Sequence, residues 1–140
     1  MVGLVLNNFD LPDRIEEKSI KRWITDCVLA EKKILGNLNY EFLSDDELLK
    51  INIEYLDHNT FTDIITFNNS ENSDIISGEI YISYDRIIDN YQKHDTTLVS
   101  ETLRVIIHGV LHLCSYDDKS DSDKELMREK ENFYIAKFFA

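Results

Sequence analysis

Short stretches of apolar, β-branched and aromatic residues, bounded by polar or turn-forming residues, predict the strands of this chain. In the second stretch, Gly36 and Asn37 mark either a break or a bulge within one longer strand. The polar residues 56–60 and 68–74 are predicted loops. The predicted strands are residues 2–9, 34–42, 63–67 and 75–84.

Five other segments carry apolar residues at helical spacing. Pro12 followed by an aspartate opens the first segment, and Asp85 caps the third. Ser44 stands three residues before Glu47, which is the capping-box arrangement at the start of the second. The predicted helices are residues 13–28, 44–55, 85–91, 97–113 and 122–139.

The predicted helix 97–113 is apolar on several sides, which is typical of a buried helix. Strands alternate with helices along the chain, and no internal repeat or domain boundary is visible. The pattern therefore predicts one domain over residues 1–140 of the α/β or α+β class. We expect a single small mixed sheet packed with helices around the buried central helix.

The composition fits a folded domain, because the 140 residues are 43% hydrophobic and include 14 Phe and Tyr side chains. With 15 basic and 27 acidic side chains, the net charge is −12. A nucleic acid is a polyanion that favours basic surfaces, so this charge by itself argues against a nucleic-acid partner.

The sequence predicts a cytoplasmic protein that does not enter a membrane. No apolar run approaches the ~20 residues that a membrane span requires. Residues 1–6 are apolar but too short for a signal peptide, and they lack a basic start. The two cysteines, Cys27 and Cys114, form no disulfide framework, which suits a reducing compartment.

Two histidines lie within the predicted buried helix. His108 and His112 are four residues apart, so they share one helical face at a spacing that lets both imidazoles reach one metal ion. A turn after the helix would return a carboxylate from Asp117 or Asp118 as a third ligand. Three protein ligands and one open position are typical of a catalytic zinc site.

The same face continues toward the start of the helix. Glu101 and Arg104 complete a polar stripe with the two histidines, and such a stripe predicts the floor of a cleft. Gly109 occupies the position after the first histidine, where zinc peptidases of the HExxH type carry their glutamate base. A peptidase that uses this base is therefore disfavoured.

Residues 108–118 read HGVLHLCSYDD, and this motif resembles the signature H-G-x-L-H-L-x-G-Y-D-H of the YbeY family. That family comprises bacterial rRNA maturation factors and metal-dependent endoribonucleases, whose three histidines hold zinc. Two further blocks resemble the family in order and spacing, and the resemblance extends from residue 52 to the C-terminus. These blocks are Asn52–Tyr55 with Thr62–Phe67, and Gly78–Ser83.

The chain departs from the family pattern at three positions. Asp118 stands where the family has its third histidine, and a carboxylate oxygen is an acceptable zinc ligand. Leu56 stands where the family commonly has an arginine. Ser115 replaces a glycine in a turn that favours a positive φ, at a cost of about 1 kcal/mol.

The resemblance implies a zinc-dependent single-strand endoribonuclease that acts in rRNA maturation at the 16S 3′ end and in ribosome assembly and quality control. It implies one Zn²⁺ per chain held by His108, His112 and Asp118, with the Asp118 position preferred because it keeps the family spacing. Arg104, or His58 in the polar loop, would neutralise charge on the phosphate. Glu79 or Glu101 would accept the proton.

The expected partners are an rRNA precursor, the ribosomal subunit and ribosomal proteins. Two alternatives stay open, namely a zinc metallopeptidase-like hydrolase and a non-catalytic ribosome-assembly factor with a structural metal. Because the net charge is −12, contact with RNA should be narrow and salt-sensitive, or delegated to a basic ribosomal protein.

Overall fold

The computed structural model of the chain describes residues 1–7, 9–13 and 15–140. Strands and helices follow one another as the sequence predicts. The elements in chain order are β1 (Val2–Val5), α1 (Glu17–Ala30), β2 (Ile34–Leu43), α2 (Asp45–Leu56), β3 (Ile64–Asn68), β4 (Ile75–Ser83), α3 (Tyr84–Lys93), α4 (Leu98–Leu113) and α5 (Asp121–Phe138).

The four strands form one mixed sheet in the order β1-β2-β4-β3. β1, β2 and β4 are parallel, whereas β3 runs antiparallel to β4. The pairing of β2 with β4 shifts register between Leu35 and Leu38, so residues 34–43 are one strand with an irregularity at Gly36 and Asn37. The predicted small mixed sheet is confirmed.

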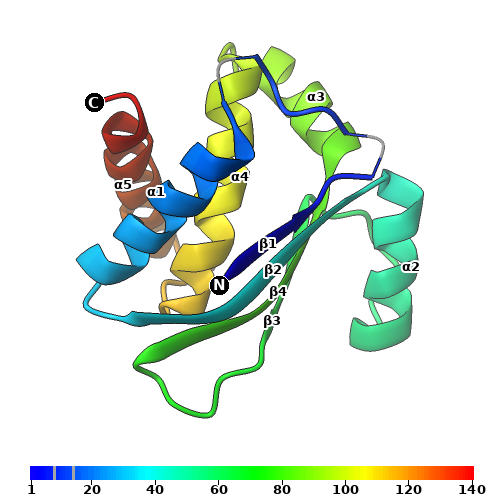
Figure 1. Ribbon diagram of the computed structural model, residues 1–140. Helices are drawn as coiled ribbons and strands as arrows, with labels where there is room; N and C mark the ends of the chain where they lie inside the picture. Colours follow the sequence, from blue (N-terminus) through cyan, green and yellow to red (C-terminus); the bar gives the residue numbers. More distant parts are fainter. Residues whose placement is uncertain (8, 14) are drawn as a thin grey trace.

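The helices lie on both faces of the sheet. Figure 1 shows α1, α4 and α5 on one side of the sheet and α2 on the other. α4 contacts β3 and β4 directly, and α5 packs against α4. The side chains of β4 alternate between the two faces of the sheet, since Ile80 and Ile82 are fully buried whereas Glu79 is exposed.

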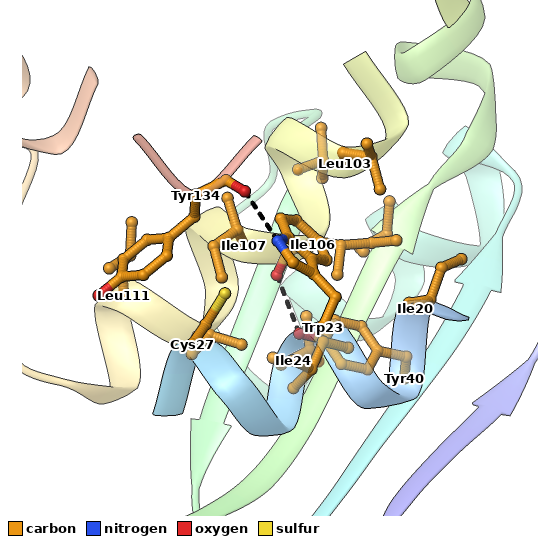
Figure 2. Packing of buried hydrophobic residues seen from close by; sticks show 14 of the residues in the cluster. Ile20, Trp23, Ile24, Cys27, Tyr40, Leu103, Ile106, Ile107, Leu111 and Tyr134 are labelled. Atoms are coloured by element: carbon orange, nitrogen blue, oxygen red, sulfur yellow. Dashed lines mark hydrogen bonds between the residues drawn. The ribbon is translucent and has the colours of Figure 1, made fainter. Parts of the chain in front are cut away.

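The core fills the space between the sheet and α4, and α4 is buried along most of its length, as predicted. Two hydrogen bonds tie neighbouring elements across this core (Figure 2). Tyr40 Oη of β2 donates to the carbonyl of Ile106 at 2.9 Å, and Trp23 Nε1 of α1 donates to the carbonyl of Tyr134 at 2.8 Å. The polar ends of these large side chains are thus paired inside the apolar core.

The N-terminal elements are shorter than predicted. β1 ends at Val5 rather than at residue 9, because the chain turns at Asn7, whose φ is 54° and whose Nδ2 donates to the Phe42 carbonyl at 2.7 Å. The helix predicted from residue 13 begins at Glu17 instead, after a turn in which the Ile15 amide donates to the Pro12 carbonyl. The predicted segments also include Asn8 and Arg14, which lie outside the described residues.

Serine hydroxyls decide where three helices begin. The predicted capping box between Ser44 and Glu47 is confirmed at the start of α2. The predicted cap of α3 at Asp85 is wrong, because the Ser83 hydroxyl accepts from the Arg86 amide and the helix starts earlier. Ser120 likewise starts α5 before the predicted residue 122. A short hydroxyl side chain reaches the exposed amides of the first turn, so the nearest suitable serine fixes the boundary.

Within the described parts of the chain, no helix combines the length and the apolar character that crossing a membrane would require.

Candidate metal centre

Gly109, the residue directly after His108, lies on the side of α4 that meets the sheet. A Cβ atom on Gly109 would lie 2.8 Å from Cδ1 of Ile80 and 3.2 Å from Cδ1 of Ile64. Helix and sheet therefore meet at this glycine with no room for a side chain. His108 and His112, one turn apart, are left partly exposed, with ring centroids 4.5 Å apart.

The end of α4 is a Schellman motif, and this turn returns the chain to the histidines. The amide of Tyr116 donates to the carbonyl of Leu111 and the amide of Ser115 donates to that of His112, both at 3.0 Å. Ser115 occupies the left-handed position of the motif with φ 78°. The sequence prediction that this turn requires a positive φ is confirmed.

The turn brings Asp118 to the two histidines. Its Oδ2 atom lies 3.4 Å from Nε2 of His108 and 3.5 Å from Nε2 of His112. The three residues each offer one ligand atom, and these atoms all lie within 4.8 Å of one another. Asp117, the rival in the sequence, is exposed and is not part of this group. The structure thus assembles the three residues that were predicted as metal ligands.

The other nitrogen of each imidazole is hydrogen-bonded, so the two Nε2 atoms are left for a ligand. His112 Nδ1 lies 3.0 Å from the Tyr116 carbonyl, and because a carbonyl only accepts, this nitrogen carries the proton. His108 Nδ1 lies 2.6 Å from Oε2 of Glu131. Hydrogen bonds of this kind fix the ring orientation and tautomer of metal-binding histidines.

The donor set and its spacing fit a zinc ion. Two neutral imidazole nitrogens and one carboxylate oxygen are common zinc ligands. A tetrahedral ion with bonds of about 2.0–2.1 Å holds its ligand atoms about 3.3–3.4 Å apart. The distances of 3.4 and 3.5 Å from Asp118 to the histidine nitrogens agree with this spacing. Binding of the ion by these residues stays a prediction.

Glu131 of α5 joins this site to Arg104. Its side chain is only 5% exposed, and its second oxygen accepts from Nη1 of Arg104 at 2.9 Å. Burial opposes the charged form of both His108 and Glu131. The hydrogen bond between them prevails, so the pKa of His108 is raised and, with the help of Arg104, the pKa of Glu131 is lowered.

Arg104 does not occupy the position that the sequence suggested for it. It also donates from Nη2 to Oδ1 of Asn132 at 3.0 Å and lies 3.8 Å from Glu101. The guanidinium is thus held among α5 side chains and Glu101, where it neutralises Glu131 rather than facing the open side of the histidines. From its place on α4, the long side chain of Arg104 could reach either the open side of the histidines or the side chains of α5. Only the packing of α5 decides between these two positions.

Sequence reasoning missed Glu131. The signal was present in α5, where Met127 and Glu131 are spaced four residues apart and Ile135 follows four residues later. All three are buried in the structure. A glutamate within such a buried stripe requires a charged or hydrogen-bonded partner, and the predicted helix 97–113 offered His108 and Arg104.

The structure does not bring Glu79 to the histidines. Residues alternate between the two faces of a strand, and Ile80 of β4 is the residue that meets α4. Glu79 therefore lies on the opposite face, where it lines a pocket with Tyr55, Phe67 and other residues. The prediction of Glu79 as the proton acceptor does not fit this position.

The other sequence candidates also lie apart from the three predicted ligands. Glu101 is buried and its pKa is raised by burial, although Arg104 opposes the shift. His58 lines a separate pocket beside β3 that Leu56 also borders. Cys114 caps the end of α4 and packs against the core, as predicted, rather than joining the metal group.

A second, partly buried cluster anchors the turn. Glu31 follows α1 and accepts hydrogen bonds from the hydroxyl groups of Tyr116, at 2.7 Å, and Tyr134. Lys130 Nζ lies 3.3 Å from the same carboxylate. Burial opposes ionisation of Glu31, but these contacts outweigh it and lower its pKa. Because the Tyr116 carbonyl accepts from His112, the cluster ties α1 and α5 to the orientation of that histidine.

Comparison with known proteins identifies the relatives of this chain. The family described as Endoribonuclease YbeY matches residues 6–139. A protein named Endoribonuclease YbeY from Flavobacterium johnsoniae is 44% identical over 122 residues, which are 87% of each chain. One of the same name from Phocaeicola vulgatus is 38% identical over 136 residues, 97% of each chain. The solution structure of TM1509 from Thermotoga maritima is 27% identical with a TM-score of 0.69, covering 99% of this chain and 89% of that one.

Proposed function

The chain belongs to the YbeY family, and from this premise we propose that it is a zinc-dependent endoribonuclease. Its zinc ion would be held by His108, His112 and Asp118, and it would cleave single-stranded RNA. The observation that carries the proposal is the convergence of two Nε2 atoms on one carboxylate while both Nδ1 atoms are hydrogen-bonded elsewhere. This arrangement leaves three donors for one ion and an open fourth position.

A bound zinc ion would polarise a phosphate oxygen of the RNA and lower the pKa of a water molecule at the same site. The residues of the chain supply the positioning. Glu131 and the Tyr116 carbonyl hold the two imidazoles in the tautomer that presents Nε2. Arg104 balances the charge of Glu131, so that the buried carboxylate does not repel the phosphate.

Asp118 in place of a third histidine changes the electrostatics of the site. An anionic ligand reduces the net positive charge at the ion by one unit relative to a neutral imidazole. We therefore expect a bound water that is less acidic than at a three-histidine site, and a pH optimum of cleavage that is correspondingly higher.

The peptidase alternative is disfavoured by packing as well as by sequence. A glutamate base after His108 would have to extend from position 109, where even a Cβ atom meets Ile80. Glu79 of β4 does not replace such a base, because it lies on the face of the strand opposite α4.

We place the activity in rRNA maturation at the 16S 3′ end and in ribosome assembly, in the cytoplasm, as the family resemblance implies. Both cysteines are free, which suits a reducing compartment. The acidic chain would also suit a basic ribosomal protein as partner.

The test is a cleavage assay on a fluorescent single-stranded RNA with the purified protein, its metal content measured in parallel. We expect one zinc per chain and cleavage that stops with a chelator and returns with zinc. His108→Ala should lose both the metal and the cleavage. His94→Ala removes an exposed histidine at the end of α3 and serves as the matched control.

Cleavage that persists in His108→Ala after loss of the metal would contradict the proposal and indicate a contaminating nuclease. A protein that binds zinc and co-sediments with ribosomal subunits, yet never cleaves RNA, would favour the assembly factor with a structural metal.

A further inference from the structure

A pocket of about 230 Å³ opens directly beside the predicted metal ligands, between α4 and α5. Two of its walls are His108 of α4 and Asp118 of the turn. The opposite wall is α5, which contributes Lys124 and Arg128 together with the buried Met127 and Glu131. The pocket therefore connects the metal site with two cations that the family motif does not include.

Lys124 and Arg128 stand four residues apart, so their side chains share one face of α5. Both are exposed. Among residues 1–7, 9–13 and 15–140, neither side chain donates a hydrogen bond to another protein group. The nearest carboxylate to Arg128 is Glu131, whose Oε1 lies 4.0 Å from Nε, beyond hydrogen-bond distance.

Glu131 does not neutralise these two cations, because its oxygens are already used. One oxygen accepts from Arg104 at 2.9 Å, and the other from His108 at 2.6 Å. Because Glu131 is hydrogen-bonded to Arg104 and His108, Asp118 is the other carboxylate that lines the pocket with the two cations. On a chain of net charge −12, Lys124 and Arg128 thus place two positive side chains directly beside the predicted metal ligands.

The proposed reaction requires positive charge for the phosphates of the substrate, and neither residue that the sequence suggested for that task stands free beside the histidines. His58 lines a separate pocket beside β3, and the Arg104 guanidinium is held by Glu131 and Asn132. Lysine ammonium and arginine guanidinium groups with free donors are the usual phosphate-binding groups in proteins.

We propose that Lys124 and Arg128 form the phosphate-binding wall of the active site and contact the RNA backbone next to the phosphate at the histidines. This inference rests on the proposed function. Under this inference, the narrow and salt-sensitive contact with RNA comes from two residues on α5, and the remaining acidic surface repels the polyanion.

The test compares two double variants of equal net charge. Lys124→Gln/Arg128→Gln removes the proposed contacts, and Lys18→Gln/Lys50→Gln removes two exposed cations from α1 and α2. Each zinc-loaded protein is titrated with a fluorescent single-stranded 2′-O-methyl RNA at several KCl concentrations. Cleavage of the unmodified RNA, zinc content and thermal midpoint are measured on the same samples.

We expect the Lys124/Arg128 variant to bind at least tenfold more weakly than the wild type at low salt. The slope of log affinity against log salt should fall in magnitude by ~1.4, since each contact to a single-strand phosphate contributes about 0.7. Zinc content and the thermal midpoint should stay unchanged, and the control variant should keep the wild-type slope.

Equal slopes and equal affinities in the two double variants would overturn this inference alone, provided that the wild type cleaves RNA and His108→Ala does not. A wild-type protein that neither binds nor cleaves RNA would overturn the proposed function, and this inference with it.

Discussion

Replacing Glu131 by glutamine is expected to weaken zinc binding by about 10–100-fold, although Glu131 is not itself a predicted ligand. Its carboxylate accepts two hydrogen bonds, from His108 Nδ1 and from Arg104 Nη1. A glutamine amide has a single oxygen to accept with, and its NH₂ group then faces a donor. The substitution therefore breaks at least one of the two bonds at a side chain that is only 5% exposed.

The size of the effect follows from these contacts. A hydrogen bond to a charged group is worth about 1.5–3 kcal/mol, and the Glu131 side chain is 5% exposed, so solvent screens it little. Loss of one such bond should lower the free energy of unfolding of the metal-free protein by about 2 kcal/mol. Loss of the orientation of His108 should lower zinc affinity by about 1.4–2.7 kcal/mol, the equivalent of the 10–100-fold change.

The two effects are measured separately. Urea unfolding in the presence of a chelator gives the stability of the metal-free protein. Competition with a chromophoric chelator, without urea and at a temperature well below the unfolding midpoint, gives the zinc affinity of the folded protein. Glu129→Gln changes an exposed residue on the same helix and is the matched control, expected to alter neither quantity.

A purely structural role for Glu131 would lower the unfolding free energy and leave the zinc affinity of the folded protein within twofold of the wild type. That result would refute the reasoning, because it would show that His108 keeps its orientation without the carboxylate.

Three further predictions concern packing, the turn and pH. Gly109→Ala should lower the unfolding free energy by about 1 kcal/mol in urea despite the better helix propensity of alanine, because the new Cβ meets Ile80; a gain in stability would contradict the packing argument. Ser115→Gly should raise the thermal midpoint by about 2–4 °C by relieving the positive φ, whereas Ser73→Gly, at a loop position without a positive φ, should not; equal shifts would refute the strain argument. Glu31→Gln should cost about 1–3 kcal/mol at pH 7. Because the pKa of Glu31 is lowered by folding, its contribution is present above the unfolded value of about 4.3 and is lost as the pH falls through the lower folded value, so unfolding curves of variant and wild type should approach one another as the pH falls below that unfolded value.

Local sequence signals accounted for the elements of the fold and for the main residues of the site. The order of strands and helices followed from apolar spacing, and the capping box at Ser44 followed from a motif of four residues. His108 and His112 share a helical face whatever the rest of the chain does. The requirement for a positive φ at Ser115 was likewise visible, since the turn after a helix has a preferred geometry.

Boundaries depended on competition between neighbouring residues. The start of α3 was assigned to Asp85, yet Ser83 takes the cap because its hydroxyl reaches the Arg86 amide. The start of α1 was placed several residues early, because apolar spacing alone does not separate a helix from the turn that leads into it.

Contacts between elements distant in the chain were beyond the sequence. Arg104 and Glu131 are 27 residues apart, and Glu31 and Tyr116 are 85 residues apart. Each pairing exists only because α5 packs against α4 and the end of α1 lies against the turn. Glu79 lies on the face of β4 opposite α4, and which face of the strand α4 covers is likewise a contact between distant elements.

The sequence by itself determined the family, the class of fold and the residues predicted to bind the metal, because these depend on spacing within single helices, strands and turns. Only the tertiary structure decided which carboxylate orients His108, that Arg104 is held by α5 side chains and Glu101, and which cations stand beside the predicted metal ligands. These roles depend on which side chains meet across α4 and α5, and a buried charge takes whichever partner the packing brings within reach.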